Sequence, residues 1–372
     1  MISVLHVLGP GCDETACQTL QMLCSRFSGD RARHAVCSMD GQTAVTAKRF
    51  LATDVRFTPA RIWSALNWAP RLADAARDCS ADVIHAWDIG AARLVSARLP
   101  DLPLVLSLAD PGPARDFARW LRSFPKGAAV AVGNQTILSR LLAAGVAPER
   151  SVVIRGAVDF KAINQARAAA SRAPSSERAG PSLLLAGPPS EAGGQYYGVW
   201  AAAILSLVVP GLRVTLPYDN RESRRVRRFA ESIQMPSLVV VPDPRSRWAD
   251  LVVGADVFLV PAVGDVCTEP IGWAMAAGLP IVGSAVRCVA ELIADRSNGL
   301  LCKPRRPRLL AARLLTAIED AGLRTRVGGV ARGQAYEVFG IRRFADNFAR
   351  LYDNVLSGRL PGDGIRDAAM VA

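Results

Sequence analysis

Residues 254–284 have the sequence GADVFLVPAVGDVCTEPIGWAMAAGLPIVGS. This stretch holds two short apolar runs, Val257–Val260 and Pro280–Gly283, separated by a segment long enough for a helix. A strand that connects through a helix to a second strand of the same sheet forms a crossover, which makes the two strands parallel. The stretch therefore predicts one strand–helix–strand unit of an α/β sheet that is covered on both faces.

The same alternation extends outward through most of the chain. Further apolar, β-branched runs form two groups: residues 3–8, 34–39, 82–86, 104–108, 129–132 and 152–154, and then 182–186, 212–216 and 238–241. The chain has 372 residues, which is more than one hydrophobic core usually supports. We therefore expect two doubly wound α/β domains, with ligands bound at the carboxyl ends of their strands.

The predicted boundaries follow from a segment between the two groups of strands. Its second half is rich in Ser, Pro and Gly, which is the composition of a linker. We expect a first domain over residues 1–166, a linker over 167–181 and a second domain over 182–338. Helices are expected over 307–321 and 333–356. Residues 339–358 are expected to form a helix that packs back on the first domain, followed by a tail over 359–372.

Bulk composition limits the class of protein. Hydrophobic residues make up 50% and charged residues 21% of the chain, which excludes a mainly disordered protein. The eight cysteines form no C-x-x-C pair and there are three histidines, so we expect no structural zinc site and reduced, buried thiols. The N-terminus lacks the basic region of a signal peptide, and no apolar run is long enough to span a membrane. The sequence predicts a soluble, cytoplasmic protein.

The charge balance points to an anionic partner. Lys and Arg total 45 against 33 Asp and Glu, which gives a net charge of +12. Nearly all of the basic residues are arginines, whose guanidinium groups suit phosphates and carboxylates. The densest run is RESRRVRR at 221–228. It predicts either a solvated helix face or a peripheral contact with anionic lipid at the inner face of a membrane. No motif for nucleic-acid binding accompanies it, so no nucleic-acid partner is expected.

Residues 254–284 resemble the donor-site segment of retaining GT-B glycosyltransferases, specifically glycosyltransferase family 4. The segments ADVFLVP (255–261), AMAAGLPIVGS (274–284), AELI (290–293) and NGLL (298–301) occur in the family's order and spacing. Residues 135–159 resemble the strand and helix that close the family's N-terminal domain. The resemblance implies a GT-B fold, with two Rossmann-like domains facing across a cleft.

The resemblance also implies an activity. Such an enzyme transfers a sugar, with retention and without a metal or other cofactor, from a nucleotide sugar (UDP-, GDP- or ADP-linked) to an acceptor. The acceptor here is unknown and is expected to be a sugar or a lipid-linked molecule. A diphosphate leaving group can be stabilised by helix N-termini and basic side chains instead of Mg²⁺.

The family's pair of donor-site glutamates corresponds to Asp265 and Trp273 in this chain. Asp265 keeps a carboxylate for the donor sugar and is a predicted catalytic residue. Trp273 cannot replace a glutamate, because indole has one N–H donor and no acceptor. It either stacks on another group, or the ribose is held differently, or no nucleotide binds. Glu269 either reaches into the site or is solvated, and Glu291 either lies near the donor or starts a helix.

The family's phosphate clamp has lost its cations in this sequence. After the first strand of the second domain, Gly187 is followed by Pro188 where the family has arginine, and no lysine follows. Arg287 either replaces the missing cation or projects into solvent. In the first domain, Gly9 and Gly11 are the candidate phosphate loop after the first strand.

Two further catalytic candidates lie on the acceptor side. The segment LSLAD at 106–110 aligns with a family segment that ends in His-Asp, so the histidine is replaced by Ala109 and Asp110 remains. His85 is expected at the end of a strand, either facing the cleft or hydrogen-bonded within the fold. The replacements at Trp273, Pro188 and Ala109 leave a second hypothesis open. In that hypothesis the chain is a catalytically inactive GT-B protein that serves as a binding or scaffold partner.

Overall fold

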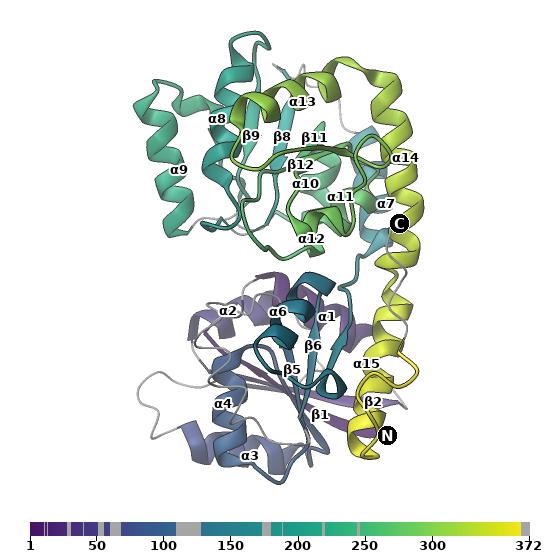
Figure 1. The fold of residues 1–372 in the computed structure, drawn as a ribbon. Helices are drawn as coiled ribbons and strands as arrows, with labels where there is room; N and C mark the ends of the chain where they lie inside the picture. The colour runs from purple at the N-terminus through teal and green to yellow at the C-terminus, as the bar shows by residue number, and fades with distance from the viewer. Residues whose placement is uncertain are drawn as a thin grey trace. The chain divides into compact units, whose positions relative to one another are not determined.

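The computed structural model describes residues 1–10, 12, 14–27, 31–39, 41–50, 56–59, 68–108, 128–172, 180–187, 189–217, 220–243 and 246–365. The chain divides into two compact units (Figure 1). The first contains Met1–Ala157 together with Ile341–Asp367, and the second contains Val158–Gly340.

The first unit is built on a parallel sheet. Over the described residues its strand order is β3-β2-β1-β4-β5-β6-β7. These strands are β1 (Ile2–Leu8), β2 (Ala32–Ser38), β3 (Arg56–Pro59), β4 (Val83–Ala86), β5 (Leu104–Leu108), β6 (Ala129–Val132) and β7 (Ser151–Val153). Its helices are α1 (Glu14–Arg26), α2 (Gly41–Phe50), α3 (Trp68–Asp78), α4 (Ile89–Arg98), α6 (Gln135–Ala143) and α15 (Ile341–Leu356). Because both faces of the central strands are covered, β4, β5 and β6 are apolar along nearly their whole length.

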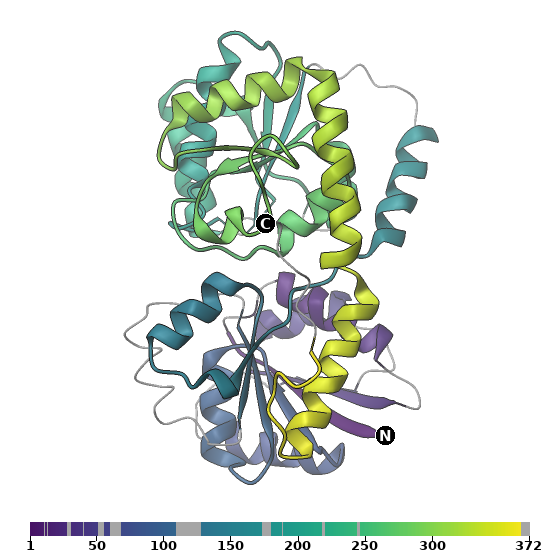
Figure 2. The ribbon, with the colours of Figure 1, turned by 45° about the vertical axis from the view of Figure 1, so that its right-hand side comes forward.

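Helix α15 belongs to the first unit although it lies near the end of the chain. Phe344, Phe348 and Tyr352 are spaced four residues apart and therefore lie on one face of the helix. This face is buried in a cluster with Leu20 and Leu23 of α1. Figure 2 shows α15 in yellow beside the strands of the first sheet.

The second unit repeats the same winding. Its strand order over the described residues is β10-β9-β8-β11-β12-β13, and every ladder between them is parallel. The strands are β8 (Ser182–Leu185), β9 (Arg213–Thr215), β10 (Val239–Val240), β11 (Val257–Val260), β12 (Ile281–Ser284) and β13 (Leu300–Cys302). The helices are α7 (Phe160–Arg172), α8 (Gln195–Ser206), α9 (Arg221–Ser232), α10 (Trp248–Gly254), α11 (Glu269–Ala276), α12 (Arg287–Ala290), α13 (Pro307–Glu319) and α14 (Ala321–Val338).

The two doubly wound sheets confirm the predicted fold class, and several details differ from the expectations. Strands β3 and β13 were not predicted, because RFTP contains an arginine and a proline and LLC has three residues. The helix expected over 333–356 is interrupted at Phe339 and Gly340. There the backbone turns, and Gly340 forms a parallel bridge with Val158.

The structure divides the chain at Ala157, earlier than the boundary at residue 166 that was expected from the sequence. Helix α7 covers part of the segment expected to be a linker and belongs to the second unit. The reason is packing, since Ile163 and Ala166 are buried in the same cluster as Trp248 and Phe339. Among the described residues, no helix is both long enough and apolar enough to cross a bilayer.

Candidate functional site

Three loops of the second unit follow the carboxyl ends of β8, β11 and β12, at one edge of the sheet. The first two loops are joined by backbone hydrogen bonds. The N–H groups of Val263 and Gly264 both donate to the carbonyl of Ala192, at 2.8 and 3.2 Å. The second and third loops are joined through Cys288, whose Sγ accepts from the N–H of Val266 at 3.4 Å. The edge where a doubly wound sheet usually binds ligands is therefore one connected structure.

The loop after β8 is held by the side chain of Gln195, the first residue of α8. Its Nε2 donates to the carbonyl of Ala186 at 3.1 Å, and its Oε1 accepts from the N–H of Ser190 at 3.2 Å. The Oγ of Ser190 accepts from the N–H of Gly193 at 2.9 Å. The predicted donor-binding residue Gly187 begins this loop with φ of 60°, a conformation that favours glycine. The loop is thus shaped by amide and hydroxyl groups rather than by the basic side chains of a phosphate clamp.

Gly194 places the N-terminus of α8 against the loop after β11. It is the N-cap of the helix, with φ of 64°, and a Cβ at this position would lie 2.3 Å from the carbonyl oxygen of Pro261. Only glycine allows this close approach. The first turn of α8 consequently lies at the edge where the three loops meet.

We expect Gly194→Ala to destabilise the second unit. The left-handed backbone alone costs alanine about 1–2 kcal/mol, and the contact with Pro261 must also be relieved by moving the loop. Urea unfolding measures this loss. The matched control is Gly329→Ala, because Gly329 lies in helix α14 with open space around the added methyl. That change is expected to stabilise by about 0.5–1 kcal/mol, and equal destabilisation by both variants would contradict the role given to Gly194.

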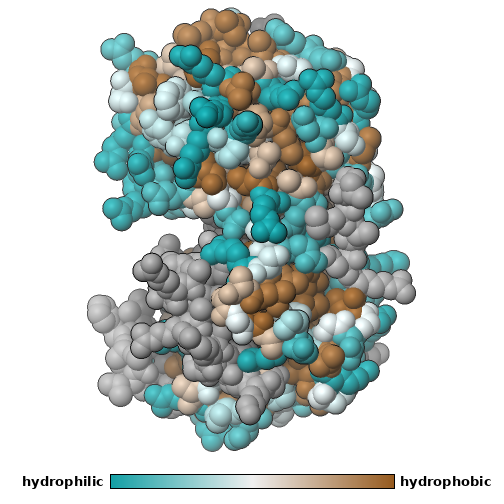
Figure 3. All heavy atoms as spheres, in the orientation of Figure 1, coloured by the Kyte–Doolittle hydropathy of each residue, from teal (hydrophilic) through white to brown (hydrophobic). Residues whose placement is uncertain are grey.

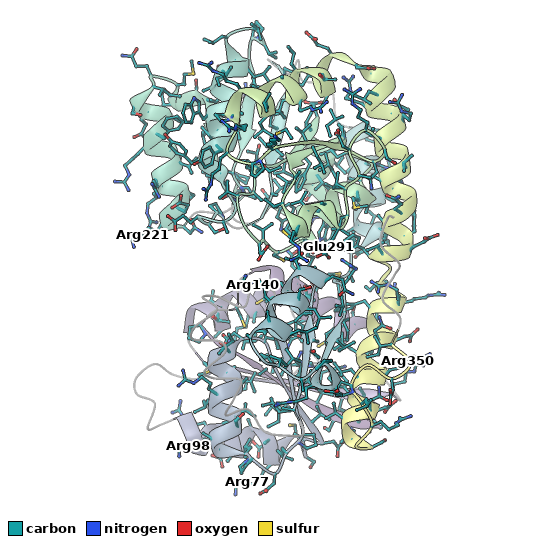
Figure 4. The ribbon with its side chains drawn as sticks, viewed as in Figure 1. Arg77, Arg98, Arg140, Arg221, Glu291 and Arg350 are labelled. Atoms are coloured by element: carbon teal, nitrogen blue, oxygen red, sulfur yellow. The ribbon has the colours of Figure 1, made fainter. Side chains whose placement is uncertain are left out.

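Two of the predicted carboxylates lie around one buried thiol. The pKa of Cys288 is raised to about 11, mainly by burial and to a smaller extent by the nearby negative charges of Asp265 and Glu291. Asp265 is partly buried in the loop after β11, whereas Glu291 is 6% exposed and follows α12. Figure 4 shows Glu291 at the edge of the second unit where α12 lies. The segments that carry Asp265 and Glu291 therefore meet at Cys288, whose protonated thiol joins them as a structural element.

The residues predicted on α11 are buried. Trp273 is 7% exposed and belongs to the apolar cluster that also contains Ile271 and Phe339. It is a core residue, and this packing leaves little of its ring to stack on a ligand. Glu269 lies one turn earlier, in the first turn of the helix, and is 9% exposed. The expectation of a solvated glutamate is therefore wrong, and its carboxylate lies where the partial positive charge of a helix N-terminus favours it. Arg287 is exposed on α12.

His85, a predicted catalytic residue, lies inside the first unit. It is fully buried, with Nδ1 at 2.7 Å from the Tyr352 hydroxyl and Nε2 at 2.7 Å from Oγ of Ser107. Its ring also stacks on Trp87. Burial lowers the pKa of His85 to about 3, with a smaller contribution from His34. Of the two alternatives for His85, the structure shows the histidine that is hydrogen-bonded within the fold, and not one that faces a ligand. The reason is that α15 covers this face of the sheet, and Tyr352 and Ser107 occupy both ring nitrogens.

Gly9, from the predicted phosphate loop, lies at the carboxyl end of β1. A Cβ at Gly9 would lie 2.1 Å from the Asp88 carboxylate, so the chain passes directly against this side chain. Asp88 caps α4 by accepting from the N–H of Ala91 at 2.7 Å. Asp88 was not predicted as part of this edge, although an aspartate directly before a helix is a recognisable N-cap signal. Gly11 and Asp110, together with Ala109 and Pro188, lie outside the described residues.

The described residues contain one group that could hold a metal ion, formed by His6, Cys24 and His34. The hydrogen bonds explain it without a metal. Trp87 donates to Nδ1 of His6 at 3.2 Å, so the proton of neutral His6 is on Nε2. That nitrogen lies 2.9 Å from Nδ1 of His34, and Nε2 of His34 faces the carbonyl of Phe27. Because both ring nitrogens of His6 and of His34 already take part in hydrogen bonds, this arrangement leaves neither side chain a nitrogen to ligate a metal.

Comparison with known proteins agrees with the fold. The profile of the family "Glycosyl transferases group 1" matches residues 205–320, which include α9, β11, α11 and β12. A search of curated proteins finds no significant match.

Solved structures match over nearly the whole chain. HepE of Anabaena, in complex with UDP-glucose, has a TM-score of 0.76 at 18% identity and covers 96% of this chain and 100% of its own. Sucrose-phosphate synthase of Thermosynechococcus elongatus has a TM-score of 0.76 at 13% identity, with coverage of 96% and 100%. A glycosyltransferase of Rickettsia africae has a TM-score of 0.73 at 14% identity, with coverage of 95% and 98%. At these identities the likeness establishes the fold, and the fold is GT-B.

Proposed function

We propose that the protein is a GT-B glycosyltransferase, of the family 4 type, that transfers a sugar from a nucleoside diphosphate to an acceptor. The observation that carries the proposal is the junction at the carboxyl edge of the second sheet, where the loop with Asp265 is hydrogen-bonded at Val266 to Cys288, three residues before Glu291. Asp265 and Glu291 lie in the segment that matches the group 1 profile. The nucleotide-sugar donor is further supported by HepE, whose structure holds UDP-glucose.

In the proposed site the carboxylates bind the donor sugar. A carboxylate accepts hydrogen bonds from sugar hydroxyl groups, and such bonds to a charged group are stronger than neutral ones. Asp265 lies in a loop that is fixed at Val266 by the hydrogen bond to Cys288, so its position is set before the donor binds. The transfer is proposed to proceed with retention of configuration at the sugar.

The first turn of α8 is proposed to bind the diphosphate. This turn lies at the connected edge because Gly194 packs against the carbonyl of Pro261. The partial positive charge of a helix N-terminus stabilises the negative charge that develops on the leaving diphosphate. We therefore propose that the reaction is independent of a metal ion, despite the replacement of the basic residues of the family's clamp.

A panel of UDP-, GDP- and ADP-sugars tests the function. A ligand present at 100 times its dissociation constant stabilises the folded protein by about 2.7 kcal/mol, which a thermal-shift assay detects. We expect one nucleotide class to stabilise the protein and its sugar to be released or transferred at the same rate with and without EDTA. The absence of a shift with every nucleotide sugar would contradict the proposal. A shift without any turnover would favour the inactive binding protein instead.

A further inference from the structure

Helices α8 and α9 pack against each other, and they carry exposed arginines on α9 and exposed apolar side chains on α8 and just after it. Arg221, Arg224, Arg225 and Arg228 of α9 are all exposed, whereas Ser223, Val226 and Ala230 of the same helix are buried. Figure 3 shows a hydrophilic surface where Figure 1 places α9. We refer to the four exposed arginines, together with Trp200, Leu207 and Val208, as the α8–α9 face.

The arginines of this face keep a strong excess of positive charge. The sequence of α9 contains five arginines and two glutamates. One glutamate, Glu222, lies 3.7 Å from Arg225, and an exposed pair of this kind is weak. The helix is held in place independently of its charges, because Asn220 and Ser223 form a reciprocal capping box. The positive charge is therefore presented on a fixed helix.

The apolar part of the face lies on α8. Trp200 is 42% exposed, and Leu207 and Val208, just beyond the C-terminus of the helix, are 75% and 67% exposed. Tyr196 and Trp200 pack on Phe229 of α9, with ring centroids 4.4 and 6.5 Å from that of Phe229. The aromatic side chains therefore join the two helices, and the exposed tryptophan lies beside the helix that carries the arginines.

We infer that the α8–α9 face binds the surface of a bilayer that contains anionic phospholipid. Each basic residue near such a surface contributes about 1 kcal/mol of attraction, and tryptophan favours the boundary between headgroups and acyl chains. Neither the arginines nor the apolar side chains would support this inference by themselves, because isolated arginines and leucines are common on protein surfaces. Exposed arginines next to exposed apolar side chains of a neighbouring helix are typical of proteins that lie on a membrane.

The face is linked to the candidate donor site. Nδ2 of Asn220, the N-cap of α9, donates to the carbonyl of Pro189 at 2.8 Å, and Pro189 belongs to the loop after β8. The start of α9 therefore lies beside the edge where the donor is proposed to bind. This placement favours a lipid-linked acceptor, which would be presented at the same membrane surface. The statement about the acceptor rests on the proposed function.

Vesicle flotation tests the inference. The full chain is mixed with vesicles of phosphatidylcholine alone, or of phosphatidylcholine with 30 mol% phosphatidylglycerol, and the bound fraction is measured at two salt concentrations. We expect the protein to bind the vesicles that contain phosphatidylglycerol and not those of phosphatidylcholine alone. Binding to the anionic vesicles should be weaker at high salt. The triple variant Arg224→Gln/Arg225→Gln/Arg228→Gln is expected to lose on the order of 100-fold in affinity. Trp200→Ser is expected to weaken binding at both salt concentrations, since its contribution is apolar.

The matched control is Arg305→Gln/Arg308→Gln/Arg326→Gln, which removes the same charge from exposed arginines elsewhere on the second unit. The inference is overturned if the wild type does not bind anionic vesicles, or if this control loses as much affinity as the α9 variant. It is also overturned if the α9 variant retains vesicle binding but loses binding to a single-stranded oligonucleotide. The nucleotide-sugar thermal shift should be equal in all variants, so a failure of vesicle binding is distinguishable from a failure of the proposed activity.

Discussion

Asp265→Ala is expected to lower kcat/KM for nucleotide release by about 10²- to 10³-fold, because it removes hydrogen bonds between a carboxylate and the donor sugar. A hydrogen bond to a charged group contributes roughly 1.5–3 kcal/mol, and one carboxylate can accept two of them. The substrate for this measurement is the nucleotide sugar that stabilises the protein most in the ligand panel. Asp265→Asn keeps one carbonyl acceptor and is expected to lose less.

The control for this prediction is Glu319→Gln, which removes one carboxylate from an exposed position at the end of α13. It should leave kcat/KM unchanged within twofold. Thermal unfolding of the variants without ligand shows whether the fold survives, which is expected because Asp265 is only partly buried. If Asp265→Ala retains the full rate while Glu291→Gln loses it, the sugar is bound by the other carboxylate and the assignment of Asp265 is wrong.

The sequence was sufficient to predict the fold because its apolar runs repeat with crossover-length spacing in both halves of the chain. The runs at Val257–Val260 and Leu104–Leu108 form strands with the predicted bounds. Strand β3, in contrast, is a strand because it pairs with β2. Its four residues have no apolar pattern that could predict this pairing. Periodicity reports what a segment buries on its own, and it misses segments whose position depends on a neighbour.

The candidate site was predictable to a smaller extent. Asp265 and Glu291 are 26 positions apart in the sequence, and it was the resemblance to a family, rather than any local pattern, that suggested both. Gln195 shapes the loop after β8 through two hydrogen bonds, but a single glutamine in a sequence carries no signal of such a role. His85 shows the opposite error. Its position at the end of a strand suggested a catalytic role. The sequence could not show that it is buried, because the helix that covers it begins more than 250 positions later.

The first unit is expected to lose stability in mild acid. All three histidines of the chain, His6, His34 and His85, lie in this unit, and burial lowers the pKa of each below its usual 6.5. The unfolded chain therefore binds more protons than the folded one once the pH falls below about 6.5. The contribution of the neutral histidines is complete above that pH and decreases as the pH falls toward the folded values. For His85, whose folded pKa is about 3, the loss at pH 5 is about 2 kcal/mol, and His6 and His34 add to it in the same direction.

Urea unfolding at pH 7.5, 6 and 5 measures this loss, and the protein provides its own control. The second unit contains no histidine, so its unfolding transition should shift much less over the same range. His34→Gln, at the least buried of the three positions, should make the first transition less dependent on pH while keeping the unit folded. If both transitions shift equally, carboxylates common to the two units cause the acid sensitivity. A first transition that does not depend on pH would mean that the histidines bind protons equally in the folded and unfolded states. His6 would then be protonated at pH 5 in the folded state and could not accept from Trp87. The chain of hydrogen bonds from Trp87 through His6 to His34 would in that case be assigned incorrectly.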